Sequence, residues 1–154
     1  MTRTKTIETS SLVGQEVLIK AWVQARRNMG KIVFLDLRDR FGILQVVAVP
    51  SELDAESAEL LKDIRSEFVL AITGVVQARG AKQINKDMPT GGVELLAKKI
   101  EILSSAETPP FEIDNEERQA NEELRLKYRY LDLRHARLQT NIILRHKVIN
   151  FLRS

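Results

Sequence analysis

Several side chains between positions 26 and 94 are of the types that bind nucleic acid. Arg26, Arg27 and Arg79 carry guanidinium groups, which can hold a phosphate or a base edge through two parallel hydrogen bonds. Phe34 carries a ring on which a base can stack, a contact that contributes roughly 1–3 kcal/mol. Gln45 can donate and accept hydrogen bonds at the same time, which suits the edge of a base.

Each of these residues also has a plainer interpretation. Phe34 can instead cap the hydrophobic core at one end of a barrel, and Gln45 can be an ordinary surface residue. Glu94 can accept a hydrogen bond from a base amino group or remain a solvated carboxylate. The residue types alone leave these alternatives open.

Catalytic and metal-binding patterns are not found in the sequence. The chain has no Cys, which excludes a thiolate nucleophile, a thiolate metal site and a disulfide framework. Its two histidines, His135 and His146, lie among Lys and Arg and are predicted to be surface residues. Asp36 and Asp39 are predicted to form salt bridges with the flanking Arg38 and Arg40. We therefore expect no catalytic residue and no metal site.

The elements that must position the candidate residues are β-strands. Residues 16–24, 31–38 and 43–49 each alternate apolar and polar side chains, the pattern of a strand with one buried face. In the second of these strands Val33, Leu35 and Leu37 share one face, so Phe34 is predicted to point outward. Residues 26–30 have turn chemistry, because Asn and Gly tolerate unusual backbone angles.

A helix and two further strands are predicted downstream. Ser51 is the expected N-cap of the helix, which includes apolar residues at helical spacing from Leu53 to Phe68. Residues 68–78 and 93–103 predict two more strands, with a long polar loop over residues 80–92 between them.

The predicted order is strand, strand, strand, helix, strand, strand. This order indicates a mainly β chain folded as a five-stranded Greek-key barrel of the OB type, with one helix between strands three and four. In that fold, the loop between strands one and two, the loop between strands four and five and the face of strands two and three bind oligonucleotides or oligosaccharides. Both loops are basic here, since they carry Arg26, Arg27, Lys31, Lys82 and Lys86.

Length, composition and charge fit this interpretation. The chain has 154 residues, enough for one domain with a short appendage, and 44% of them are apolar. Lys and Arg exceed Asp and Glu by 24 to 21, and the charges alternate between basic and acidic stretches along the chain. The N-terminus lacks an apolar stretch, and no apolar run is long enough to span a membrane, so we expect a soluble, cytoplasmic protein without a membrane partner.

The last third of the chain is organised differently. Residues 105–123 contain Pro109, Pro110 and several acids without periodicity, and are predicted to be a hinge or linker. The apolar residues from Leu138 to Leu152 follow helical spacing, which predicts a C-terminal helix.

Several blocks of the sequence resemble the N-terminal anticodon-binding domain of bacterial-type aspartyl-tRNA synthetases. They include Phe34 to Arg40, Gly42 to Val47, Asn85 to Gly91 and Thr108 to Phe111. The most distinctive block runs from Leu124 to Arg134 and is shared with the sister lysyl and asparaginyl enzymes. The resemblance covers nearly the whole chain. It implies an anticodon-binding domain at 1–104, a hinge at 105–123 and the truncated start of a class II catalytic domain at 124–154.

The resemblance also implies a site and a set of partners. The anticodon loop of a tRNA would be bound by Arg26, Arg27, Phe34, Gln45, Arg79, Gln83, Asn85 and Glu94. The full-length enzyme would be a homodimer that uses ATP and Mg²⁺ to ligate aspartate to tRNA. The chain itself would lack the active site, need no cofactor and be able to remain a monomer.

Two other interpretations remain open. The chain can be an OB module that binds single-stranded nucleic acid without regard to sequence. It can also be a standalone interaction protein that has kept the fold and lost the catalytic domain.

Overall fold

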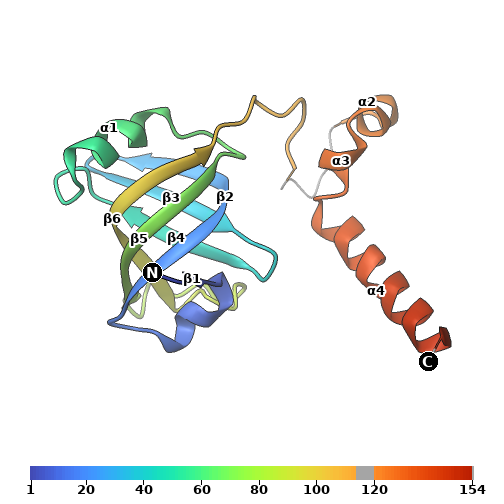
Figure 1. The fold of residues 1–154 in the computed structure, drawn as a ribbon, viewed down its shortest axis with the longest axis horizontal. Helices are drawn as coiled ribbons and strands as arrows, with labels where there is room; N and C mark the ends of the chain where they lie inside the picture. The colour runs from blue at the N-terminus through green and yellow to red at the C-terminus, as the bar shows by residue number, and fades with distance from the viewer. Residues whose placement is uncertain (114–119, 154) are drawn as a thin grey trace. The chain divides into compact units, whose positions relative to one another are not determined.

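The computed structural model describes residues 1–113 and 120–153, which form two compact units. One unit comprises Met1–Thr108 and the other Pro109–Ser154. The predicted hinge at 105–123 includes residues 114–119, which lie outside the described residues, as does Ser154. Figure 1 labels the helices and strands of both units.

The first unit contains a closed β-barrel, which confirms the predicted OB fold (Figure 1). Its strands are β2 (Glu16–Met29), β3 (Ile32–Arg38), β4 (Ile43–Ala48), β5 (Val69–Ala78) and β6 (Val93–Ser104). They are hydrogen-bonded in the order β2-β3-β4-β6-β5, and a further pairing of β2 with β5 closes the barrel. The pairing of β4 with β6 is parallel, whereas β2–β3, β3–β4, β5–β6 and β2–β5 are antiparallel.

The hydrophobic core lies inside the barrel and follows the alternation predicted from the sequence. Val33, Leu35 and Leu37 of β3 are buried, while Phe34 between them is half-buried and lies on the outer face. The same period holds in β2 for Val17, Ile19, Ala21 and Val23, and in β4 for Leu44, Val46 and Ala48. At about 25 cal/mol per Å² of apolar surface removed from water, this core is the main source of stability.

The hairpin between β2 and β3 is tighter than the sequence pattern indicated. Residues 26–29, predicted to be a turn, continue strand β2 and pair with β3, with Arg27 opposite Phe34. The chain reverses at Gly30, whose φ of +66° lies in the left-handed region that favours glycine. The extra strand length changes the site, because Arg26 and Arg27 belong to the sheet and not to a loop.

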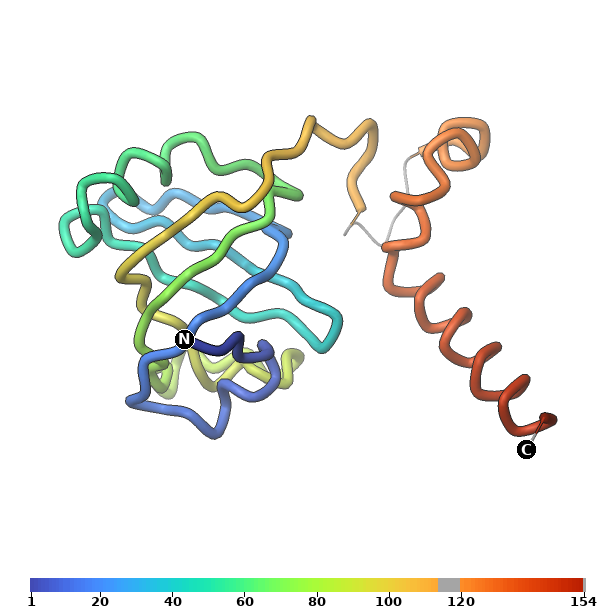
Figure 2. Tube along the Cα trace, in the orientation of Figure 1, coloured from blue at the N-terminus to red at the C-terminus, as the bar shows by residue number. Residues whose placement is uncertain are grey.

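Helix α1 (Ala55–Asp63) connects β4 to β5 at one end of the barrel, and both figures show its path (Figures 1 and 2). Its N-cap is Asp54, whose side chain accepts a hydrogen bond from the backbone N–H of Ser57; the predicted cap at Ser51 is wrong. Ser51 instead follows Pro50 in a turn where the N–H of Glu52 donates to the carbonyl of Val49. Leu61 and Ile64 anchor the helix in the core.

The N-terminal segment adds two short elements that sequence patterning did not indicate. Strand β1 (Arg3–Thr4) pairs in parallel with β2, and a 3₁₀ helix, η1, follows at Thr6–Ser11. Asp39, in the turn between β3 and β4, fixes this segment by accepting hydrogen bonds from the backbone N–H and the hydroxyl of Thr6.

The second unit is helical. It contains α2 (Glu122–Lys127), α3 (Arg129–Asp132) and α4 (Ala136–Arg153). The predicted C-terminal helix is present as α4 and begins at Ala136 rather than Leu138. Its large apolar side chains are exposed, among them Ile143, Leu144, Phe151 and Leu152. Among the described residues, no helix is both long and apolar enough to cross a membrane.

Candidate nucleic-acid interface

A row of polar side chains crosses the outer face of the barrel beside Phe34. Arg27 extends from β2, Asp36 from β3, Gln45 from β4 and Glu94 from β6. Asp36 lies on the same face as Phe34 because it follows Phe34 by two positions in a strand of period two. Gln45 pairs with Asp36, and Arg27 pairs with Phe34, so both side chains share this face. Strand pairing therefore brings together residues that are far apart in the sequence.

Hydrogen bonds join these side chains into one chain of contacts. Arg27 Nη2 donates to Asp36 Oδ1 at 2.9 Å and lies 3.5 Å from Gln45 Oε1. Gln45 Nε2 donates to Glu94 Oε2 at 3.1 Å. Arg79 Nε lies 3.6 Å from the same Glu94 oxygen and forms an ion pair with it. On either side of the neutral Gln45, a carboxylate is paired with an arginine. We call this set the polar row: Asp36, Arg27, Gln45, Glu94 and Arg79.

Arg79 is the buried end of the polar row. Its side chain is only 5% exposed, against 54% for Arg27. Its Nε and Nη2 atoms are buried without a hydrogen-bond partner among the described residues, which is a costly arrangement for a guanidinium. Because the Arg79 side chain is buried against Glu94, its charge is not presented to solvent.

Phe34 stands beside the polar row. It pairs with Arg27 on one side and with Val47 on the other. Val33 and Leu35 fill the core below it, so its ring is not needed to close the barrel interior. A half-buried ring, supported by a strand and flanked by Arg27, is suited to stack on a planar base.

Arg26 lies apart from Arg27, although the two are adjacent in sequence. It pairs with the buried Leu35, and side chains of directly opposed residues share a face of the sheet. Its Nε is buried without a hydrogen-bond partner in the part of the chain that the structure describes. The structure therefore brings Arg27, Gln45, Glu94 and Arg79 together, and places Arg26 on the other side of the strand.

Gln83 and Asn85 lie in the loop over residues 80–92, and both are exposed. This loop has internal structure: the N–H of Asn85 donates to the carbonyl of Gly91, and the Asn85 side chain accepts from the N–H of Asp87. The buried hydroxyl of Thr90 donates to the carbonyl of Ile43, which fixes the loop to the start of β4. The loop thus presents both side chains from a defined backbone.

The predicted pairing of the two aspartates is wrong. Asp36 bonds Arg27 of the neighbouring strand, and Arg38 instead forms a bidentate ion pair with the buried Glu67. Asp39 accepts hydrogen bonds from Thr6, Phe41 and Gly42 and lies 3.6 Å from Arg3. Asp36 and Arg38 are two positions apart on one strand and share a face, but residues on the neighbouring strand lie closer. The ion pair of Asp36 is therefore formed across the strands, with Arg27.

The pKa directions of the two aspartates differ. Burial raises the pKa of Asp36 above its ordinary value, and the nearby Arg27 and Arg79 oppose this shift. Burial would also raise the pKa of Asp39, but the hydrogen bonds from Thr6, Phe41 and Gly42 outweigh it and hold the pKa below its ordinary value.

Asp36 is the residue of the site that sequence analysis did not select. Its position in β3 provided a usable signal, because strand alternation places it on the same face as Phe34. Its contact with Arg27 depends on the register of the β2–β3 hairpin, which the sequence pattern did not define.

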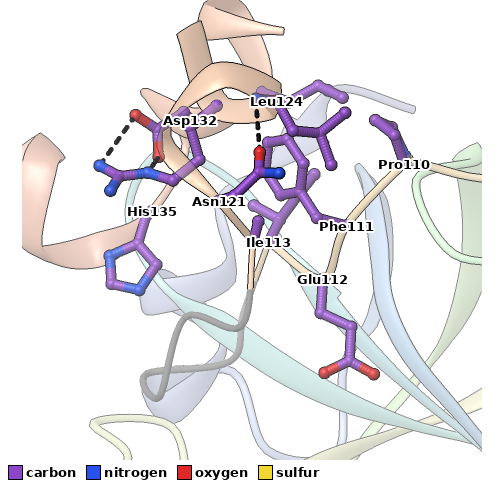
Figure 3. A pocket seen from close by; sticks show the side chains of 11 residues that line it. Pro110, Phe111, Glu112, Ile113, Asn121, Leu124, Asp132 and His135 are labelled. Atoms are coloured by element: carbon purple, nitrogen blue, oxygen red, sulfur yellow. Dashed lines mark hydrogen bonds and ion pairs between the residues drawn. The ribbon is translucent and has the colours of Figure 1, made fainter.

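A hollow of about 430 Å³ occurs in the helical unit (Figure 3). Its lining includes Phe111, Ile113, Asp132 and His135, and Figure 3 shows His135 beside Asp132. Asp132 is 3% exposed and is neutralised by Arg125 and Arg129. His135 is 8% exposed, so its prediction as a surface residue is wrong: it lies in this hollow. His146 is exposed.

The described residues contain no group of three or more His, Asp or Glu side chains that could hold a metal ion.

Comparison with known proteins identifies the family to which the barrel belongs. Residues 17–103, which include nearly all of the barrel strands and the whole polar row, match the family model for tRNA anti-codon OB-fold nucleic acid binding domains. The chain is 49% identical over 144 residues to an aspartate–tRNA ligase of Ruminiclostridium cellulolyticum, covering 94% of this chain and 24% of that protein. It is also 49% identical over 145 residues to an aspartate–tRNA(Asp/Asn) ligase of Dehalococcoides mccartyi, again with 94% and 24% coverage.

A solved structure has a similar fold. The asparaginyl-tRNA synthetase of Pyrococcus horikoshii, complexed with asparaginyl-adenylate, superposes with a TM-score of 0.71 at 29% identity. That match covers 87% of this chain and 29% of the synthetase. This chain thus spans about a quarter of the length of the curated ligases that it matches. Because the family model matches more than half of the chain, and because the chain folds as the closed barrel described above, the chain belongs to the tRNA anti-codon family of OB-fold nucleic acid binding domains.

Proposed function

We propose that this chain reads the anticodon of a tRNA, as the anticodon-binding part of an aspartate–tRNA ligase. One observation carries the proposal: the half-buried ring of Phe34 stands beside a row of hydrogen-bonding side chains on the outer face of the barrel. The 49% identity to aspartate–tRNA ligases supports the choice of ligase.

The site residues would act in different ways. Phe34 would stack on an anticodon base, and Arg27, more than half exposed, would meet a phosphate or a base edge. Gln45 and Glu94 would hydrogen-bond base edges, because an amide offers both donor and acceptor and a carboxylate accepts from amino groups. Gln83 and Asn85 would approach the anticodon from the loop at 80–92.

The two remaining arginines would contribute less directly. Arg79 is too buried to reach a phosphate and would orient the carboxylate of Glu94. Arg26 lies on the other side of β2 from Arg27, and we assign it a weaker, electrostatic contribution.

The larger enzyme belongs to the same proposal. It would be a cytoplasmic class II homodimer that ligates aspartate to tRNA with ATP and Mg²⁺ bound by residues outside this chain. Residues 1–104 would form the anticodon-binding domain, 105–123 the hinge and 124–154 the start of the catalytic domain. The exposed apolar side chains of α4 support the assignment of residues 124–154 to a larger domain, because an exposed apolar surface of this kind marks a site of contact with other parts of a protein.

The competing function is binding of single-stranded nucleic acid without regard to sequence. The experiment is equilibrium binding of the chain to a short hairpin with the aspartate anticodon GUC and to hairpins with one anticodon base changed, at two salt concentrations. We expect GUC to be preferred at both salt concentrations, because base contacts are screened less than phosphate contacts. Equal affinities that weaken together as salt rises would establish the sequence-independent function instead.

A further inference from the structure

A carboxylate on the face proposed to bind RNA requires an explanation. Asp36 is on the same face as Phe34, and its side chain is 18% exposed. Its negative charge repels the phosphates of any RNA that approaches this face. Burial also works against its ionised form, since the pKa of Asp36 is raised above its ordinary value. For binding to a polyanion, a neutral residue at this position would be more favourable.

The contact with Arg27 supplies the explanation. Asp36 Oδ1 accepts a hydrogen bond from Arg27 Nη2 at 2.9 Å across the β2–β3 hairpin. The other contact of this guanidinium within the polar row, to Gln45 Oε1, is long at 3.5 Å. More than half of the Arg27 side chain is exposed, and a long side chain at this exposure adopts many rotamers unless an ion pair holds it.

We infer that Asp36 is a positioning residue for anticodon reading, because it holds the guanidinium of Arg27 beside Phe34. Its charge lowers the affinity of this face for RNA in general, and its contact with Arg27 increases the discrimination between bases. The inference rests on the proposed function. Fixing Arg27 in advance lowers the ordering cost of binding for the RNA whose bases fit the fixed guanidinium. An RNA with the wrong bases gains no such advantage and still meets the repulsion from the carboxylate.

This role predicts that Asp36→Asn affects the two affinities differently. Affinity for the GUC hairpin at moderate salt should fall by roughly tenfold, because contacts within one network couple by this order. Affinity for a hairpin with a changed anticodon should stay the same or rise at low salt, because one repulsive charge has been removed. A role limited to fold stability would lower both affinities together.

The experiment measures both affinities for the intact chain and four variants. Asp36→Asn and Arg27→Ala are tested singly and combined. Glu101→Gln is the matched control, because it removes one negative charge from an exposed position on β6 outside the polar row. In the Arg27→Ala background we expect Asp36→Asn to leave discrimination unchanged. The control should keep the discrimination of the original chain. Thermal unfolding of each variant verifies that it folds.

Several outcomes would overturn the inference. Unchanged discrimination in Asp36→Asn would do so, as would an equal loss of discrimination with and without Arg27. If Asp36→Asn does not fold, Arg27→Lys supplies a second test, since lysine keeps the charge but lacks the planar guanidinium that Asp36 holds. Retained discrimination in Arg27→Lys then contradicts the inference. If the original chain does not distinguish GUC from the changed hairpins, the proposed function itself fails, and this inference fails with it.

Discussion

At the scale of single residues, Asp39 holds the N-terminal segment on the barrel. Its carboxylate is fully buried and accepts hydrogen bonds from the backbone and hydroxyl of Thr6 and from the backbone of Phe41 and Gly42. Arg3 lies 3.6 Å from one of its oxygens. A carboxylate with this many donors stabilises the fold in its ionised form.

Replacement of this carboxylate should therefore destabilise the barrel. We expect Asp39→Ala to lower the free energy of unfolding by about 2–3 kcal/mol, because it leaves several donors without an acceptor. Urea denaturation followed by circular dichroism measures this loss. Asp63→Ala, at the exposed end of α1, is the control and should change stability little. An equal effect of the two substitutions would contradict the role given to Asp39.

The same residue gives a dependence on pH. Because the pKa of Asp39 is lower in the folded chain than in the unfolded chain, its contribution to stability is present above pH ~4 and is lost as the pH falls through the folded value. The stability difference between the original chain and Asp39→Asn should therefore shrink as the solution is acidified below pH ~4. Denaturation curves across an acid series measure it, and a constant difference would refute the assignment.

Strand alternation was enough to predict the outward position of Phe34, but it did not predict which charges pair. Asp36 contacts Arg27 because the register of the β2–β3 hairpin, in which the chain reverses at Gly30, brings these two residues close together on neighbouring strands. The burial of His135 was also missed, because it depends on packing within the helical unit and not on local sequence.

At the scale of elements, the loop over residues 80–92 is shaped by close backbone contacts. A Cβ at Gly91 would lie 1.8 Å from the carbonyl oxygen of Asn85, whereas a Cβ at Gly92 would meet nothing within 4 Å. Only the first position is therefore restricted to glycine by space. Since Asn85 and Gln83 belong to this loop, its backbone controls where both side chains are presented.

This contrast predicts different outcomes for two adjacent substitutions. Gly91→Ala should displace the loop, lower the free energy of unfolding by about 1–3 kcal/mol, and weaken binding of the GUC hairpin. Gly92→Ala should leave both properties nearly unchanged. Thermal unfolding and hairpin titration of the two variants provide the comparison. A full-affinity Gly91→Ala variant would show that the shape of the loop does not matter for binding.

The sequence was sufficient for the barrel because each strand has a clear alternation and the order of elements is characteristic of the OB fold. The sequence was not sufficient to predict the residues at which strands and helices begin and end. Arg26 and Arg27 were predicted in a turn because Asn28 and Gly30 have turn chemistry, but cross-strand pairing extends β2 through Met29. The elements β1 and η1 carry no periodic signal and are held by tertiary contacts to β2 and Asp39.

At the scale of the whole molecule, the proposed interface belongs to one unit. Phe34, the polar row and the loop over residues 80–92 all lie within Met1–Thr108. The core of the barrel also lies within this unit. The helices α2, α3 and α4 supply none of the candidate interface residues.

This division predicts that residues 1–108 fold and bind RNA without the rest. A chain ending at Thr108 should unfold in one cooperative transition and bind the GUC hairpin with the affinity of the longer chain. Calorimetry and hairpin titration test the two parts of this expectation. A loss of affinity in the shortened chain would show that the helical unit contributes to the interface.

The most direct test of the central claim is the affinity of Phe34→Ala for the GUC hairpin, compared with Phe41→Ala. Phe41 is an exposed ring in the turn after β3, is not part of the polar row, and controls for the loss of an aromatic side chain. We predict that Phe34→Ala loses roughly 1–3 kcal/mol of binding free energy, the contribution of one stacked base, while Phe41→Ala binds as the original chain does. Equal affinities of the two variants would contradict anticodon reading by this face of the barrel.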